Sequence, residues 1–247
     1  GISFGYWGFG ELVFYQMTLQ FYSTMMEQTL TAVPLFVFMG IMMEKANLME
    51  RLFDSCQQLL ARLRGSLYLA VMFVATIFAA ATGIVGASVT ILGIMAGKSM
   101  IRSKYDVQMS AGLIAAGGTL GILIPPSILL IVYAATASVS VVKLYAAALI
   151  PGFMLAGFYV VYVVARAVIN PSLCPKPKDA VDYGIFKSLL LVFQAFVPLA
   201  ALILAVLGSI LFGLATPSEA AAMGALGGII LAVVYKAFTW ERLRESV

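Results

Sequence analysis

Apolar residues occupy most of the chain in long runs, and charged residues gather at the ends of these runs. Because about 20 apolar residues span a bilayer as an α-helix, the runs predict membrane crossings rather than the core helices of a soluble fold. The predicted crossings are 26–44, 108–138, 142–165, 188–212 and 218–236. The pattern therefore predicts an all-α, multi-pass membrane protein.

Three further segments have the pattern of helices that lie at a membrane surface. Residues 1–23 are aromatic and weakly amphipathic, while 47–64 and 239–247 alternate charged and apolar residues at helical spacing. The last two adjoin predicted crossings almost without a linker. They either brace a fixed frame around a moving element or only connect crossings at the interface, and composition leaves both interpretations open.

The composition fits a membrane setting. Hydrophobic residues make up 62% of the 247 residues and charged residues 11%, and the mean hydropathy is +1.03. A soluble fold of this length could not bury so much apolar surface. Cys56 and Cys174 are far apart in the sequence and lie beside basic segments, so we expect unreactive free thiols rather than a disulfide.

The net charge of +4 indicates membrane orientation rather than nucleic-acid binding, because the basic residues fall into four clusters. The clusters are Lys45, Arg51, Arg62 and Arg64; Lys98, Arg102 and Lys104; Arg166, Lys176, Lys178 and Lys187; and Lys236, Arg242 and Arg244. If all four are cytoplasmic, 14 of the 15 basic residues lie inside and only Lys143 lies outside, as the positive-inside rule requires.

The apolar run 66–97 has basic residues at both ends, so it must enter and leave the membrane on the same side. Its 32 residues suit two limbs of about 15 residues, each about 23 Å long. We therefore predict a re-entrant hairpin over 66–101 with its tip at Thr82–Thr90. The alternative is one long crossing, which would place the Lys98 cluster outside.

The predicted hairpin tip combines small residues with hydroxyls. Gly83 and Gly86 permit backbone angles that other residues avoid. The end of the first limb would carry partial negative charge and favour a cation, and the start of the second, capped by Ser88 or Thr90, would favour an anion. The alternative is that the small residues only allow close helix packing.

Residues 117–127, with the sequence GGTLGILIPPS, predict a break inside a crossing. Three glycines weaken the helix, and Pro125 and Pro126 remove two backbone donors. The carbonyls freed before the prolines are available to an ion. The half-helix that starts near Pro125 would direct its amides at an acidic ligand, with Ser127 adding a hydroxyl. The alternative is a simple proline kink.

Ionisable side chains are absent from both broken regions. Residues 66–97 and 107–142 contain no Asp, Glu, Lys, Arg or His, and the chain has no His at all. Proton relays need such groups, and divalent cations usually recruit carboxylates, so neutral oxygens favour sodium. Glu219 lies near two apolar runs, but its position predicts a helix cap with Thr216 or Ser218.

Five blocks of the chain resemble the large membrane subunit of TRAP transporters, the tripartite ATP-independent periplasmic family. They are PLFVFMGIMMEKANLMERLFD (34–54), GIVGASVT (83–90), SAGLIAAGGTLGILIPPSILLIVYA (110–134), IPG (150–152) and GLATPSEAAAMGAL (213–226). The resemblance implies sodium-driven elevator transport of an organic acid, with a periplasmic substrate-binding protein, a small membrane subunit and the lipid bilayer as partners. It also implies the cytoplasmic membrane of a bacterium or archaeon.

Carried onto this chain, the resemblance implies that the hairpin tip and the broken helix form one sodium site and half of a substrate pocket. The expected ion-binding residues are Thr82, Gly83, Gly86, Ser88, Gly118, Thr119, Gly121 and Pro125. The expected substrate-binding residues are Ala87, Ser88, Thr90, Pro126 and Ser127. No cofactor other than the coupling ion is expected.

The resemblance also implies a division of the chain. Residues 1–65 and 188–247 are expected in a fixed scaffold, 66–165 in a moving transport part, and 166–187 in a cytoplasmic linker.

The chain departs from the family in two respects. The predicted hairpin tip has fewer hydroxyls than is frequent in the family, which shifts the expected ion ligands toward backbone carbonyls and Ser88. A second hairpin and a second Pro-Pro break are missing, so we expect the chain to be the first half of the subunit.

Two other functions remain possible at the level of sequence. The broken helices could serve only to pack a partner, which would make the chain a noncatalytic assembly subunit. An intramembrane hydrolase using Ser88 or Ser127 would lack a base, because neither broken region contains His or Lys. We therefore expect a transporter and not an enzyme.

Overall fold

The structure is a computed structural model that describes residues 2–60, 65–171, 174–175 and 185–246. Within these ranges every regular element is a helix, which confirms the all-α prediction. The elements are α1 (Ile2–Phe9), α2 (Leu12–Met25), η1 (Gln28–Thr31), α3 (Ala32–Lys45), α4 (Leu48–Leu60), α5 (Ser66–Thr82), α6 (Val85–Arg102), α7 (Val107–Thr119), η2 (Leu120–Ile122), α8 (Ile128–Ala137), α9 (Val141–Ile169), α10 (Ile185–Leu211), α11 (Pro217–Val234) and α12 (Trp240–Ser246).

Three described helices are long and apolar enough to cross a membrane: α9, the part of α10 from Ser188, and α11. A fourth span results if α2 and the following η1–α3 segment are one crossing bent by 48°. The length and apolar composition of these helices indicate a multi-pass membrane protein. The predicted crossing 26–44 corresponds to η1 and α3, and the predicted crossing 108–138 is broken into α7, η2 and α8.

Helix α5 occupies the centre of the bundle. It packs against α3, α4, α6, α7, α9 and α10, and 13 of its 17 residues are buried. The helix is apolar on all sides, which is the pattern of a fully buried helix. The C-terminal residues of α5, up to Thr82, are therefore buried, while the turn into α6 at Gly83 and Ile84 is half-buried.

Helices α3, α10 and α11 form a second group beside α5. A Cβ at Gly224 of α11 would lie 2.6 Å from Met39 Sδ of α3, so this glycine allows the close approach of the two helices. At the other end of α11, the Tyr235 hydroxyl donates a hydrogen bond to the Gln194 carbonyl at 2.9 Å. The Arg51 guanidinium lies 5.2 Å from the centre of the Tyr235 ring. Tyr235 thereby joins α11 to both α10 and α4.

Helix α4 is amphipathic, as predicted, but its apolar face is covered by protein. Leu48, Leu52 and Phe53 are almost fully buried, and the helix packs against α5 and α10. The periodicity of the sequence gives the apolar face without identifying what covers it. The last four residues of the predicted segment, 61–64, lie outside the described residues.

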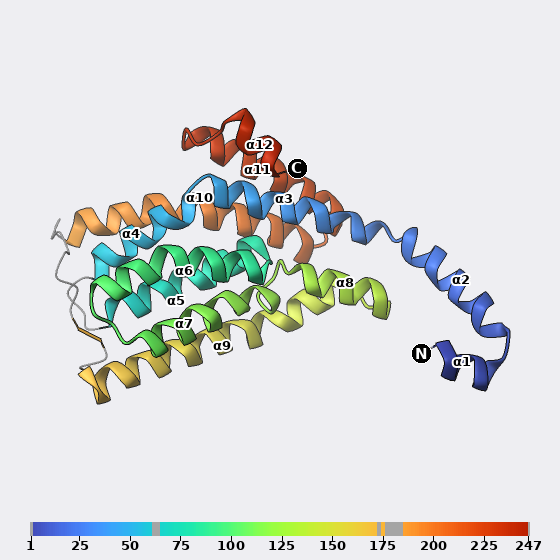
Figure 1. Ribbon diagram of the computed structural model, residues 1–247. Coiled ribbons are helices and arrows are strands. Elements are labelled where there is room, and N and C mark those ends of the chain that lie inside the picture. The colour runs from blue at the N-terminus through green and yellow to red at the C-terminus, as the bar shows by residue number, and fades with distance from the viewer. Residues whose placement is uncertain (1, 61–64, 172–173, 176–184, 247) are drawn as a thin grey trace.

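The N-terminal segment differs from the single interfacial helix that was predicted over 1–23. It forms α1 and α2, separated at Gly10, whose φ of +61° ends α1. Residues with such a left-handed backbone terminate helices, and glycine adopts it without steric cost. Figure 1 shows both helices extending away from the bundle, and most of their large apolar side chains are exposed.

The ends of the helices agree with part of the predicted grouping of basic residues, that of the second and third clusters. Figure 1 shows the start of α5, the turn between α6 and α7, the end of α9 and the start of α10 at the same end of the bundle. This end carries the Lys98–Lys104 cluster and Arg166. Arg62, Arg64, Lys176 and Lys178 of the same clusters lie outside the described residues. The assignment of this end of the bundle to the cytoplasm stays a prediction.

A cap at the start of α11 and a helix within 239–247 are confirmed, while the position of that helix at a membrane surface stays a prediction. Thr216 and Glu219 form a capping box at the start of α11: the Glu219 carboxylate accepts from the Thr216 amide at 2.8 Å, and Thr216 Oγ1 accepts from the Glu219 amide at 3.3 Å. The predicted segment 239–247 contains α12, whose Ser246 is buried against Met42 of α3. Helix α12 therefore packs onto the α3 side of the bundle.

Candidate functional site

The predicted hairpin tip is a true break between two helices. Helix α5 ends at Thr82, Gly83 has a φ of +61°, Ile84 is extended, and α6 begins at Val85. Helices α5 and α6 then pack against each other along their lengths (Figure 1). A continuous helix through this region is thereby excluded, and the chain forms a helical hairpin.

The second predicted break lies between α7 and α8. After Thr119 the chain makes one 3-10 turn, and regular helix resumes only at Ile128. The predicted half-helix start near Pro125 is therefore three residues too early, because Ser127, the residue before α8, is still extended. The peptide bond between Pro125 and Pro126 is cis.

Hydrogen bonds hold the second break in place. The Ser127 hydroxyl donates to the Ile122 carbonyl at 2.6 Å, and the Ser127 carbonyl accepts from the Tyr145 hydroxyl of α9 at 3.2 Å. Both Ser127 and Tyr145 are fully buried. Tyr145 is a residue that the sequence did not single out, since one tyrosine in an apolar run gives no signal of its partner.

The two breaks lie against each other. A Cβ on Gly83 would be 3.1 Å from the Pro126 carbonyl oxygen and 3.2 Å from the Ile128 amide nitrogen. A Cβ on Gly118 would be 3.0 Å from the Val89 amide nitrogen, one turn into α6. The hairpin tip thus touches the broken helix at both ends of the break, which brings the two predicted halves of the site together.

Thr82 and Ser88 form a buried hydroxyl pair across the hairpin turn, with their oxygens 3.0 Å apart. Thr82 also donates to the Phe78 carbonyl at 3.1 Å, and Ser88 to the Ile84 carbonyl at 2.8 Å. Two hydroxyl hydrogens serve three contacts, because each hydroxyl has one donor. One contact therefore lacks a hydrogen, and the pair holds spare lone pairs that a cation could use.

The remaining predicted site residues are buried, half-buried or exposed. Gly118, Gly121, Pro125, Pro126 and Ser127 are buried with Thr82 and Ser88, whereas Gly83 and Ala87 are half-buried. Gly86, Thr90 and Thr119 are exposed. The hydroxyls of Thr90 and Thr119 donate to the carbonyls of Gly86 and Ala116, so neither joins the buried pair.

The predicted helix caps are wrong. Neither Ser88 nor Thr90 caps α6, because each donates to a carbonyl one turn earlier within the hairpin. The N-cap of α6 is Ile84 and that of α8 is Ser127, and neither side chain accepts a bond from a helix amide. The first amides of both helices are thus without side-chain caps, and such amides are suited to an anionic ligand.

Gly40 of α3 is another contact that the sequence did not reveal. A Cβ there would lie 3.0 Å from Thr82 Cα and 3.3 Å from the Thr82 carbonyl oxygen. A lone glycine in an apolar run carries no signal of its neighbour. Among the described residues no group of three or more His, Cys, Asp or Glu could hold a metal ion, so only neutral oxygens and backbone dipoles are available at the site.

A bundle of membrane-spanning helices with two buried, mutually packed breaks defines a polytopic α-helical membrane protein of the transporter class. The particular family follows from comparison with known proteins. Residues 4–247 match the model of the family "Tripartite ATP-independent periplasmic transporter, DctM component". The chain belongs to this family, which confirms the resemblance found in the sequence.

Several curated relatives carry transporter names. The chain is 33% identical over 232 residues to the C4-dicarboxylate TRAP transporter large permease protein DctM of Pseudomonas aeruginosa, covering 93% of this chain and 52% of the relative. It is 34% identical over 230 residues to the sialic acid TRAP transporter large permease protein SiaM of Vibrio cholerae, covering 89% and 51%. It is 30% identical over 205 residues to the isethionate TRAP transporter permease protein DctMQ of Oleidesulfovibrio alaskensis, covering 81% and 31%. The chain spans about half the length of the first two relatives.

Proposed function

We propose that the complete protein to which this chain belongs carries out sodium-coupled, secondary active uptake of a small organic acid across the bacterial or archaeal cytoplasmic membrane. The substrate class is a dicarboxylate, a sugar acid or a related acid. The relatives are named for C4-dicarboxylates, sialic acid and isethionate, which are all organic acids. The observation that carries the proposal is the contact between Gly83 and Pro126, which joins the two breaks into one site.

The sodium ion is proposed to bind at the inner side of this site. The Thr82–Ser88 hydroxyl pair is buried at the turn, and its oxygens keep lone pairs that could coordinate a cation. The carbonyls at the end of α5 and in the second break would add ligands and partial negative charge. Neutral oxygens favour sodium as the coupling ion, because proton relays need ionisable side chains and divalent cations usually recruit carboxylates.

The acid is proposed to bind at the uncapped N-terminal ends of α6 and α8. Both helices begin at the junction of the breaks without a side-chain cap, and the helix dipole favours a carboxylate at such a start. The proposed pocket is formed by the expected residues Ala87, Ser88, Thr90, Pro126 and Ser127. The other half of the pocket would come from the remainder of the complete protein.

The mechanism is proposed to be an elevator. In this mechanism the hairpin α5–α6, inserted in the membrane as a re-entrant element, moves with α7, α8 and α9. The group α3, α4, α10 and α11 remains fixed, and Tyr235 strengthens this group by joining three of its helices. A small membrane subunit would brace the frame, and a periplasmic binding protein would deliver the acid.

The test is uptake of a radiolabelled C4-dicarboxylate or sialic acid into proteoliposomes that contain the complete complex. An inward sodium gradient should drive uptake, and an equal potassium or proton gradient should not. The Gly83→Ala variant should lose most uptake, since its backbone is left-handed and its methyl group would press on Pro126. Gly93→Ala of α6, which has open space around it, is the control. Uptake that is independent of sodium, or equal in the two variants, would refute the proposal.

A further inference from the structure

Helix α3 of the proposed frame reaches the tip of the α5–α6 hairpin at Gly40. A Cβ on Gly40 would lie 3.0 Å from Thr82 Cα, 3.2 Å from Thr82 Cβ and 3.3 Å from the Thr82 carbonyl oxygen. Because the Cα and the carbonyl oxygen are backbone atoms, rotation of the Thr82 side chain could not make room for a side chain at position 40. Thr82 ends α5 and belongs to the buried hydroxyl pair. Gly40 therefore joins the frame to the proposed sodium site.

Another face of α3 is fastened to α11 and α12. A Cβ on Gly224 would lie 2.6 Å from Met39 Sδ, and a Cβ on Gly228 would lie 3.6 Å from the Met39 carbonyl oxygen and from Met42 Cβ. The Ser246 hydroxyl of α12 lies 3.3 Å from Met42 Sδ. These contacts set the position of α3 in the bundle, so the surface that α3 offers to the hairpin tip is set by its neighbours in the frame.

Beyond Gly40 a groove separates the frame from the second limb of the hairpin. Glu44, one turn further along α3, lines this groove together with Ile91 and Ile94 of α6, and the groove has a volume of about 570 Å³. Its charged lining residues are Glu44, Lys45, Glu50, Glu241 and Arg242. Because charged groups are costly to bury, this lining suits water better than close packing against α6. The close approach of α3 to the hairpin is thus made at the tip.

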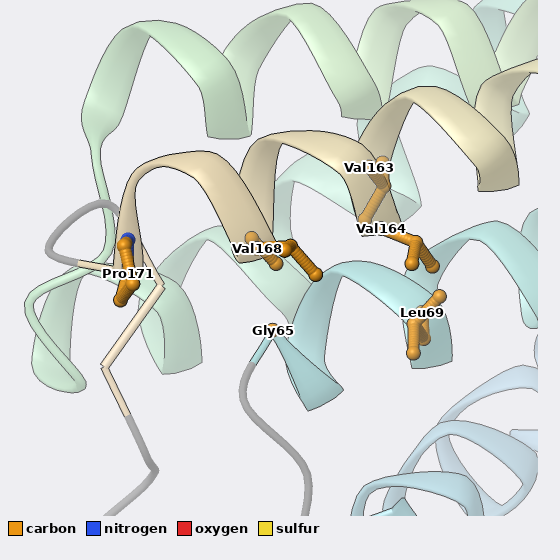
Figure 2. A pocket seen from close by; sticks show the side chains of 7 residues that line it. Gly65, Leu69, Val163, Val164, Val168 and Pro171 are labelled. Atoms are coloured by element: carbon orange, nitrogen blue, oxygen red, sulfur yellow. The ribbon is translucent and has the colours of Figure 1, made fainter.

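The opposite end of α5 contacts the proposed moving part instead. Figure 2 shows Gly65 and Leu69 of α5 facing Val164 and Val168 of α9. Helices α5 and α9 move together in the proposed elevator, so their contact persists during transport. The contact of Gly40 with Thr82 joins a fixed helix to a moving one, so it must be made and broken in each cycle.

We propose that Gly40 is a positioning residue of the sodium site, through which the frame holds Thr82 where its oxygens can bind the ion. The inference rests on the proposed function and adds to it a residue that does not itself touch the ion. A methyl group at position 40 would overpack the contact and displace the backbone of Thr82. Coupling between two sites is reciprocal. If the contact with Gly40 favours sodium binding, bound sodium must favour the contact by the same factor.

The first experiment measures sodium binding without transport, as the rise in melting temperature of the complete purified protein when sodium replaces potassium. In Gly40→Ala the sodium concentration for the half-maximal rise should increase about tenfold, the usual size of an overpacking penalty. Gly224→Ala is the matched control, because its methyl group would press on Met39 from the side of α11. It should lower the melting temperature without changing the sodium dependence.

Three results would count against these ideas in different ways. Equal changes of sodium dependence in Gly40→Ala and Gly224→Ala would overturn the proposal, since Gly40 would then act only through general packing. An unchanged sodium dependence in Gly40→Ala would overturn it as well, while the proposed function remained. A wild-type melting temperature that does not respond to sodium would overturn the proposed function itself, and this proposal with it.

The second experiment needs no variant and therefore does not depend on whether Gly40→Ala folds. Hydrogen exchange is measured on the wild-type protein with and without saturating sodium. Sodium should slow exchange around Thr82 and also in α3 around Gly40, in α3 by up to the same factor of about ten. Exchange around Gly228 of α11 should not change, because that contact lies within the frame. Protection that is confined to the hairpin tip would show that the frame takes no part in the sodium site.

Discussion

Thr82 and Ser88 bring their hydroxyl oxygens within 3.0 Å of each other across the turn of the α5–α6 hairpin. They are six residues apart in sequence, on two different helices, and both are almost fully buried. Each hydroxyl oxygen also lies within hydrogen-bond distance of a carbonyl of its own helix. The hairpin turn therefore holds a cluster of neutral oxygen atoms whose lone pairs are available to an ion that reaches it.

Removal of one hydroxyl of this pair should weaken sodium binding. Thr82→Val keeps the shape of the side chain and removes the oxygen, so the sodium concentration for half-maximal uptake should rise about tenfold, equivalent to the loss of about 1.4 kcal/mol. Thr76→Val is the matched control, because Thr76 makes the same type of bond to Met72 elsewhere in α5. A sodium dependence that is equal in the two variants would place the ion elsewhere.

The contact between Gly118 and Val89 should be sensitive to a single methyl group. In Gly118→Ala the new Cβ would meet the Val89 side chain and lie 3.0 Å from the Val89 amide nitrogen, which is backbone and cannot move freely. We expect a loss of stability of about 2 kcal/mol and a lower melting temperature. Gly112→Ala on the same helix has open space and should be neutral. Thermal unfolding in detergent measures both, and equal melting temperatures would show that α6 and α7 do not pack as described.

Tyr145 should act on the second break through Ser127. Tyr145→Phe removes the donor to the buried Ser127 carbonyl and should cost about 1–2 kcal/mol of stability. If the proposed pocket is correct, it should also raise the KM for the acid more than it lowers kcat, since Ser127 loses its position. Tyr162→Phe, an exposed tyrosine on the same helix, should change neither quantity. An unchanged KM in Tyr145→Phe would show that Ser127 takes no part in binding the substrate.

Tyr235 makes two separable contacts in the frame of α4, α10 and α11. Tyr235→Phe loses only the hydrogen bond to Gln194 and should cost about 1 kcal/mol. Tyr235→Leu also loses the ring beneath Arg51 and should cost about 0.5–1 kcal/mol more. In a double-mutant cycle with Arg51→Gln, the coupling should be present for the leucine variant and absent for the phenylalanine variant. Equal coupling in both would exclude a contribution from the ring.

The breaks could be predicted from sequence because their causes are local. Gly83 adopts a left-handed backbone, and the consecutive Pro125 and Pro126 remove two helix donors beside a glycine-rich run. Single prolines without such neighbours, Pro151 and Pro198, stay inside helices. The contact of Gly83 with Pro126 is not local. It depends on the position of α7 and α8 beside the hairpin, which no periodicity records.

Two details could not be predicted, for physical reasons. The apolar face of α4 packs against α5 and α10, and a hydrophobic stripe does not identify the protein surface that covers it. Ser88 and Thr90 were assigned as caps, yet their hydroxyls bond to carbonyls one turn earlier. A hydroxyl near a helix start has both choices, and the extended Ile84 moved the start of α6 to Val85.

Cysteine labelling can determine on which side of the membrane the α5–α6 hairpin begins and ends. Ser103 follows α6, and Ser140 precedes α9 at the opposite end of the bundle. A membrane-impermeant maleimide should label Ser140→Cys from outside intact cells and should label Ser103→Cys only after the membrane is opened. Cys56 and Cys174 are buried, so the background should be low, and protein without new cysteines is the control. Labelling of Ser103→Cys from outside would mean that the end of the bundle with the α6–α7 turn faces the periplasm. The predicted orientation, and with it the assignment of the basic clusters to the cytoplasm, would then fail even though the contact between the breaks remained.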